Sequence, residues 1–168
     1  MKARIRVLQI FNPLSIKPLT WFSLIIRIVT SSKWNHNAIE VTTETGEKFI
    51  LESIGKGVIY TPYAKWLKKG SRTVLPLYVP NSQIELSVIE SMTGKPYGFW
   101  DIARIAKYII QTRWLGHTKS WHSKAYQNKG YICSEVVCEL LGLKTKKLWL
   151  PGDFVYLPNV VIGQEFST

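Results

Sequence analysis

The sequence feature that most restricts the fold is a pair of β-rich runs joined by a short turn. Residues 37–43 and 48–54 are rich in β-branched and aromatic side chains, and residues 44–46 (Glu-Thr-Gly) lie between them. Three-residue hairpin loops commonly end on a residue in the left-handed conformation, and Gly46 suits that position. The pattern therefore predicts an antiparallel hairpin.

The turn also predicts the register of the two strands. With a three-residue loop, Thr43 pairs with Glu47 and Ala38 lies opposite Glu52. One face, expected to join the core, carries Ile39, Val41, Phe49 and Leu51. The other face carries His36, Ala38, Glu40, Ile50, Glu52 and Ile54. His36 and Glu52 then become diagonal neighbours, roughly 7–8 Å apart at the backbone. A two-residue loop would place these two side chains on opposite faces.

The remaining pattern predicts a mixture of strands and helices, hence an α+β fold. We expect strands at residues 4–11, 73–79 (with Pro76 at an edge or bulge) and 154–157. Helices are expected at residues 18–29, 61–70, 99–112 and 133–141, and a short one is expected to begin after a capping box at 82–85 and to end at Gly94. The helix at 99–112 should carry one apolar face, made of Ile102, Ile105, Ala106, Ile109 and Ile110. Residues 113–130 read as a long irregular connection.

Composition sets the class of the chain. Its 168 residues, 46% of them hydrophobic, suit one domain spanning 1–168. Two cysteines cannot build a disulfide framework or a multi-cysteine zinc site, and no metal-ligand spacing is visible, so no cofactor or metal is expected. We see no signal peptide, and residues 19–29 are too short to span a bilayer, which makes a cytoplasmic location the default.

Cys133 is the most informative single position. It falls in the expected first turn of an apolar helix, where unpaired backbone N–H groups favour a thiolate and can stabilise an oxyanion. The alternative is a small core residue, because Cys133 shares a helix face with apolar side chains and free cysteines are usually buried. Cys138, in mid-helix, is expected to be structural.

A reactive thiolate needs a proton partner, and His36 is the best candidate. It begins a strand between two asparagines, where core packing does not require a histidine. Glu52 lies in an otherwise apolar strand, and orienting an imidazole would explain its presence. A solvated sheet face is the alternative for Glu52, and Glu40 is a weaker candidate for the same task. His117 and His122 lie in the long connection, so catalytic roles are not expected for them.

Several segments carry a family resemblance. They are residues 32–39 around His36, 49–53 around Glu52, 62–67 (Pro-Tyr-Ala-Lys-Trp-Leu), 94–97 (Gly-Lys-Pro-Tyr) and 131–135 around Cys133. As an ordered set they resemble the permuted NlpC-like papain-like amidases. In that family the histidine strand precedes the cysteine helix, inverting the papain order, and the same order occurs here.

The resemblance implies a permuted papain-like fold, in which the nucleophile helix packs against an antiparallel sheet. It further implies Cys133 as the nucleophile, His36 as general base and then acid, and Glu52 as the orienting residue. Two positions depart from the family pattern: Asn37 stands where a small or apolar residue is expected, and Gly98 where an aspartate is frequent. The implied activity is acyl transfer through a thioester, on peptidoglycan peptides, other amides or lipid acyl groups, and the sequence does not choose among these substrates.

The charge of the chain points to an anionic partner. The 22 Lys and Arg minus 11 Asp and Glu give a net charge of +11. Cations gather in residues 56–72 and 113–129, which suits a cell-wall polymer, a lipid headgroup or nucleic acid, or else only a solvated surface. Two alternatives to an amidase follow: a lipid acyl hydrolase or acyltransferase with the same Cys–His pair, and a non-enzymatic module that binds nucleic acid or an anionic surface.

Overall fold

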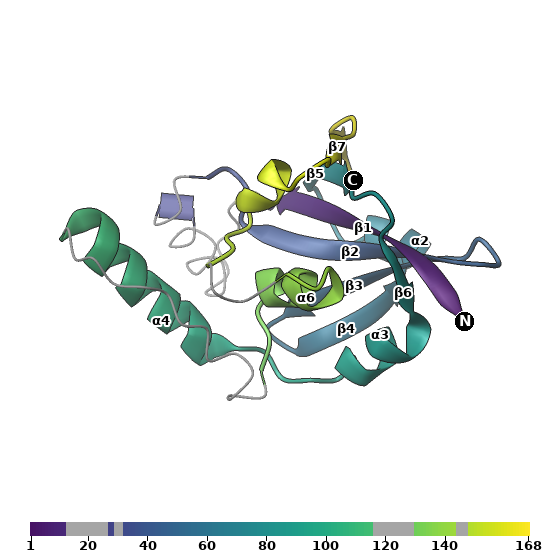
Figure 1. Cartoon of the computed structure of the whole chain (residues 1–168), viewed down its shortest axis with the longest axis horizontal. Helices are drawn as coiled ribbons and strands as arrows, with labels where there is room; N and C mark the ends of the chain where they lie inside the picture. Colours follow the sequence, from purple (N-terminus) through teal and green to yellow (C-terminus); the bar gives the residue numbers. More distant parts are fainter. Residues whose placement is uncertain (13–26, 29–31, 116–129, 144–147) are drawn as a thin grey trace.

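An open antiparallel sheet forms the centre of the α+β fold (Figure 1). The computed structural model describes residues 1–12, 27–28, 32–115, 130–143 and 148–168. The strands are β1 (Lys2–Phe11), β2 (His36–Thr43), β3 (Lys48–Ile54), β4 (Gly57–Pro62), β5 (Thr73–Tyr78), β6 (Gln83–Glu85), β7 (Val161–Ile162) and β8 (Phe166–Ser167). Their order is β4-β3-β2-β1-β5-β7, with β6 also paired to β1 and β8 to β5.

The predicted hairpin and its register are confirmed. Ala38 pairs with Glu52 across β2 and β3. The Thr43 N–H donates to the Glu47 carbonyl at 2.9 Å, and Gly46 has a φ of +84°. The three-residue turn thus places alternate side chains of both strands on the predicted faces.

Each face of the sheet carries its own apolar cluster. On one face, side chains such as Ile39 and Leu51 pack with α6 (Cys133–Leu140), which lies across β2 and β3 (Figure 1). On the opposite face the fully buried Trp66, from α2 (Tyr63–Leu67), packs with residues that include Ala38 and Ile50. Both faces of the central strands are therefore covered near the predicted site.

The helices follow the predicted apolar pattern in part. The others are α3 (Leu86–Met92), α4 (Phe99–Ile109), a π-helical turn η1 (Ile110–Trp114) and a 3-10 turn η2 (Asp153–Tyr156). Ile102, Ile105 and Ile109 are buried along α4 as expected. Ile110 is 42% exposed, contrary to prediction. At about 100° per residue it lies well to the side of the stripe that the other three isoleucines form.

Three local predictions were wrong for identifiable reasons. Residues 57–62 form β4, which the sequence pattern did not predict, so the helix predicted at 61–70 is limited to α2. Ser82 does not cap a helix: its hydroxyl donates to the carbonyls of Ile5 and Val79, and β6 follows it. The strand predicted at 154–157 is the turn η2, because the Asp153 carboxylate accepts the Leu150 N–H at 2.9 Å and closes a turn.

Two further predictions concern segments outside the described residues. The helix predicted at 18–29 has only residues 27–28 described, and most of the connection at 113–130, with His117 and His122, lies outside as well. Within the described part of the chain, no helix combines the length and the hydropathy that crossing a bilayer demands.

Gly57 provides a test of the packing between β4 and the segment after α3. Its φ is +105°, and an added Cβ would lie 2.5 Å from the Lys95 carbonyl oxygen. Gly46 also has a positive φ, but a Cβ added there would meet no atom within 4 Å. We expect Gly57→Ala to lower the free energy of unfolding by about 2 kcal/mol or more, and Gly46→Ala by about 1 kcal/mol. Urea denaturation measures both, and equal losses would contradict the close backbone contact.

Candidate active site

Cys133 is the first residue of α6, as the sequence predicted. Ile132 precedes it in an extended conformation, and the Glu135 carboxylate reaches back to accept the Ile132 N–H at 3.0 Å. This contact satisfies one donor at the start of the helix. The Cys133 side chain is buried, and it lies at the end of α6 where unpaired N–H groups create positive potential.

His36 and Cys133 come from opposite sides of the sheet and meet where β2 begins. The Thr43 N–H faces β3, and N–H groups along a strand alternate in direction, so the Asn37 N–H faces the same way. The pairing of β2 with β3 ends at Ala38 and Glu52, and the Asn37 N–H donates to the Cys133 sulfur instead. The thiol also forms a side-chain hydrogen bond with His36.

Glu52 holds the other side of the imidazole. Its Oε2 lies 3.3 Å from Nε2 of His36, which leaves Nδ1 as the ring nitrogen for the thiol. Both side chains are shielded from solvent, at 14% exposure for His36 and 4% for Glu52. The predicted residues Cys133, His36 and Glu52, called the triad below, are therefore brought together in one hydrogen-bonded row.

The contacts within the triad shift the pKa of each of its three side chains in the direction that favours the charged form. Burial opposes protonation of His36, but the hydrogen bonds to Cys133 and Glu52 outweigh it and raise the His36 pKa to about 10. Burial likewise opposes ionisation of Glu52, while His36 and then Lys69 lower its pKa to about 2. The pKa of Cys133 is lowered despite burial by His36 and by the N–H groups of Asn37 and Ser134. The arrangement favours a thiolate–imidazolium pair.

A network of backbone contacts fixes the chain that leads into α6. Ser53, next to Glu52 on β3, donates its hydroxyl to the Tyr131 carbonyl at 2.5 Å. The Gly98 N–H donates to the same carbonyl, and Tyr131 pairs with Tyr97 in an isolated parallel bridge. Burial, with the neighbouring Cys133 charge, raises the pKa of Tyr97, so this hydroxyl stays neutral. The position of Cys133 is thus tied to the strand that carries Glu52.

Asn37 and Gly98, the two departures from the resemblance, each lie against a polar group of a neighbouring segment. At Gly98 a Cβ would lie 2.9 Å from Oδ2 of Asp101, a buried carboxylate that is paired with Arg104 at 2.9 Å. The Asn37 side chain lies beside the Pro151 carbonyl, and with its amide nitrogen turned toward that oxygen the two are 3.2 Å apart. Gln9, opposite Asn37 on β1, donates to the same carbonyl at 2.6 Å.

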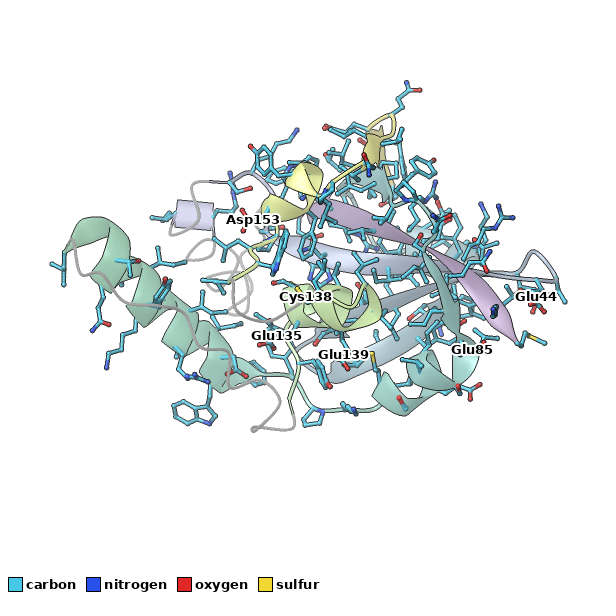
Figure 2. The ribbon with its side chains drawn as sticks, viewed as in Figure 1. Glu44, Glu85, Glu135, Cys138, Glu139 and Asp153 are labelled. Carbon is cyan, nitrogen blue, oxygen red and sulfur yellow. The ribbon has the colours of Figure 1, made fainter. Side chains whose placement is uncertain are left out.

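The other candidates have different roles. Cys138 lies further along α6 in the apolar cluster (Figure 2), and burial raises its pKa to about 12. Glu40 does not approach His36; it pairs with Arg6, so its candidacy as the orienting residue was wrong. Among the described residues, no three His, Cys, Asp or Glu side chains are arranged so that they could hold a metal ion.

One contact of the triad was not predicted from the sequence. Nζ of Lys69 lies 3.1 Å from Oε1 of Glu52, the carboxylate oxygen that His36 does not use. In the sequence, Lys69 stands out only as a member of the basic stretch at 56–72. A signal was present, because a buried carboxylate with two oxygens needs more than one partner.

Comparisons with known proteins add no family assignment: no protein-family model matches this chain, and no curated protein sequence matches it either.

Proposed function

We propose that this chain is a cysteine-dependent hydrolase of the permuted papain-like kind, with Cys133, His36 and Glu52 as its catalytic residues. The observation that carries the proposal is the row of hydrogen bonds from a helix N-terminal thiol, through a buried imidazole, to a buried carboxylate. The order of these elements in the chain and the packing of α6 on the sheet both agree with the resemblance. An inert core cysteine would not account for the buried charges of His36 and Glu52.

The geometry supports acyl transfer through a thioester. The Cys133 sulfur forms a bond to the carbonyl carbon of the substrate, and the carbonyl oxygen transiently carries a negative charge. As the carbonyl re-forms, the bond to the leaving amine breaks and His36 gives that amine its proton. His36 then takes a proton from water, the resulting hydroxide attacks the thioester, and the acid leaves while Cys133 is restored. Glu52 keeps the imidazole oriented and balances its positive charge.

Backbone N–H groups at the sulfur support the attacking thiolate. The N–H groups of Asn37 and Ser134 both donate to the Cys133 sulfur. They come from different elements, β2 and α6, and both are fixed by the fold rather than by flexible side chains. Donors of this kind stabilise the negative charge of the nucleophilic sulfur.

Peptide or acyl-amide substrates, including peptidoglycan peptides, are the first substrate class for this proposal. A lipid acyl hydrolase or acyltransferase would use the same three residues with an ester donor or another acceptor. Incubation with a panel of N-acyl amino acids, short peptidoglycan-type peptides, p-nitrophenyl acyl esters and phospholipid vesicles separates these cases. We expect peptide-level mass spectrometry to find an acyl adduct on Cys133 with one class, and none on Cys138. No adduct and no turnover with any class, or turnover that survives Cys133→Ala, would overturn the proposal.

A groove on the α2 side of the sheet favours a second candidate function, binding of an anionic ligand. The groove has a volume of about 510 Å³ and lies at the end of β1 away from His36. Its lining includes the cations Arg4, Arg6 and Lys48 and the carboxylate of Glu40. The Arg6 guanidinium already has protein partners, since it pairs with Glu40 and donates to the Tyr78 hydroxyl at 2.6 Å. The exposed Arg4, and Lys48, whose half-exposed Nζ lies 3.8 Å from the other Glu40 oxygen, are the cations that would attract an anion there.

Matched charge removal tests this second candidate. We expect the double variant Arg4→Gln and Lys48→Gln to weaken retention on heparin at 0.1 M salt by at least about tenfold, and to reduce its salt dependence. The control double variant Lys56→Gln and Lys65→Gln removes the same charge outside the groove. Equal losses in both doubles would show that only net charge matters. Cys133→Ala should leave retention unchanged in every case.

A further inference from the structure

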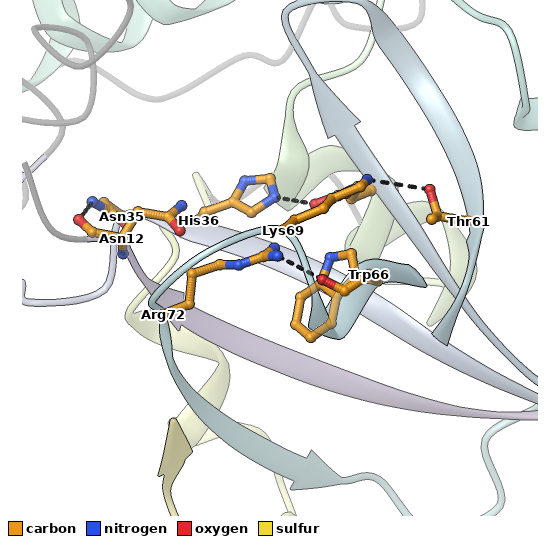
Figure 3. Close-up of polar contacts among 8 residues, drawn as sticks. Asn12, Asn35, His36, Thr61, Trp66, Lys69 and Arg72 are labelled. Carbon is orange, nitrogen blue, oxygen red and sulfur yellow. Dashed lines mark hydrogen bonds and ion pairs between the residues drawn. The ribbon is translucent and has the colours of Figure 1, made fainter. Parts of the chain in front are cut away.

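Lys69 lies just after α2 and reaches the carboxylate of the triad. Its Nζ is 3.1 Å from Oε1 of Glu52 and 3.4 Å from the Thr61 hydroxyl on β4, and Figure 3 shows the side chain extended toward Thr61. The Lys69 side chain is 35% exposed, whereas Glu52 is 4% exposed. The ammonium group can thus exchange with water on one side while it bonds a shielded carboxylate on the other.

The segment that carries Lys69 is held firmly in place. The Lys69 N–H donates to the Trp66 carbonyl at 3.1 Å, and Trp66 is fully buried under the sheet. Arg72 stacks over the Trp66 ring at 4.2 Å and donates to the same carbonyl at 2.8 Å (Figure 3). Gly70, with a φ of +112°, makes the turn between the two cations. The position of Lys69 therefore follows from an anchored backbone.

We propose that Lys69 is a positioning residue that fixes the Glu52 carboxylate so that its Oε2 faces His36. The inference rests on the proposed function of the triad. Glu52 has two oxygens in a desolvated place, and each has one charged partner: His36 at Oε2 and Lys69 at Oε1. Without Lys69, one oxygen would lose its charged partner, and the carboxylate could rotate away from the imidazole.

Lys69 also acts on the triad through its charge. The charged groups that face Glu52 are His36 from β2, Lys69 and the more distant Arg72; the Thr61 hydroxyl is neutral. Around Cys133 the titratable groups that interact with it are His36, Tyr97 and Cys138. Removing the Lys69 charge makes the electrostatic potential at the triad more negative. Protons are then held more tightly, so the thiolate of Cys133 should form at a higher pH.

The pH profile of Cys133 alkylation tests this role. Iodoacetamide is neutral, so a changed surface charge does not alter its approach to the protein. The acid limb of the profile is the pH range over which the alkylation rate rises as the thiol ionises. We expect Lys69→Met to move this limb to higher pH by about half a unit. At the low-pH end of the limb, alkylation should then be about threefold slower than in the wild type. Lys69→Arg, which keeps the charge, should stay close to the wild type. Lys68→Met, which removes a neighbouring exposed charge, should leave the limb in place.

The outcomes separate this inference from the proposed function. If the wild type shows no limb below the ordinary thiol range, the proposed function fails. If the wild-type limb is low and Lys69→Met leaves it unmoved, the role of Lys69 fails alone. Lys69→Gln keeps hydrogen-bond donors but removes the charge. It provides the same comparison of pH profiles with the wild type if Lys69→Met does not fold. A Lys69→Gln profile identical to the wild type would also overturn the proposed role.

Discussion

His36→Ala is expected to slow the alkylation of Cys133 by iodoacetamide at pH 6 by at least about tenfold. A thiol with an ordinary pKa near 8.5 is well under about 1% ionised at this pH, whereas the imidazolium partner lowers the pKa of Cys133 and so raises its thiolate fraction. The lower intrinsic reactivity of a low-pKa thiolate reduces the difference but does not remove it. Peptide-level mass spectrometry measures the rate at Cys133 separately from the rate at Cys138.

The design compares the same sulfur in two variants, so the burial of Cys133 affects both rates. Cys138 is an internal reference, since burial raises its pKa to about 12 and its labelling should be slow in either protein. At pH 9.5 the two Cys133 rates should approach each other, because an isolated thiol also ionises there. A rate at pH 6 that does not depend on His36 would mean that no ion pair exists.

Glu52→Gln is expected to lower the free energy of unfolding by about 2 kcal/mol at pH 7. The carboxylate bonds both His36 and Lys69, and glutamine cannot balance either charge. The pKa of Glu52 is depressed to about 2, so its contribution is fully present above the ordinary carboxyl range near 4.5 and is lost as the pH falls toward 2. Urea denaturation at several pH values should therefore show the wild type and Glu52→Gln converging in acid.

Glu44→Gln is the matched control for this experiment, because Glu44 lies exposed in the hairpin turn. It should change the free energy of unfolding by no more than about 0.5 kcal/mol at either pH. A gap between the wild type and Glu52→Gln that stays constant from pH 7 to pH 2.5 would contradict the charged state of Glu52. A gap that widens in acid would contradict the sign of its pKa shift.

The hairpin shows how far local rules can lead. A three-residue turn ending on Gly46 was enough to predict that Ala38 faces Glu52, and period-two alternation then placed His36 and Glu52 on one face. Helix 133–141 was likewise visible from its apolar spacing, with Cys133 at its start. These features depend on residues close in sequence, and a single choice of turn length decided the register.

Contacts between distant segments could not be predicted in the same way. The meeting of Cys133 with His36 depends on where the β2–β3 ladder ends, which leaves the Asn37 N–H for the sulfur. Ser82 looked like a helix cap, yet its hydroxyl is used by the carbonyls of neighbouring chain segments. Lys69 was seen only as one cation among several, since its partner Glu52 lies on another element.

The most direct test of the central claim is a titration of the two side chains by NMR, following the Cys133 Cβ and His36 Cε1 chemical shifts from pH 4 to pH 11. The ion pair predicts that Cys133 ionises below the ordinary thiol range while His36 stays protonated until about pH 10. A His36 that titrates near 6.5 together with a Cys133 that titrates near 8.5 would contradict it, because each group would then behave as if the other were absent.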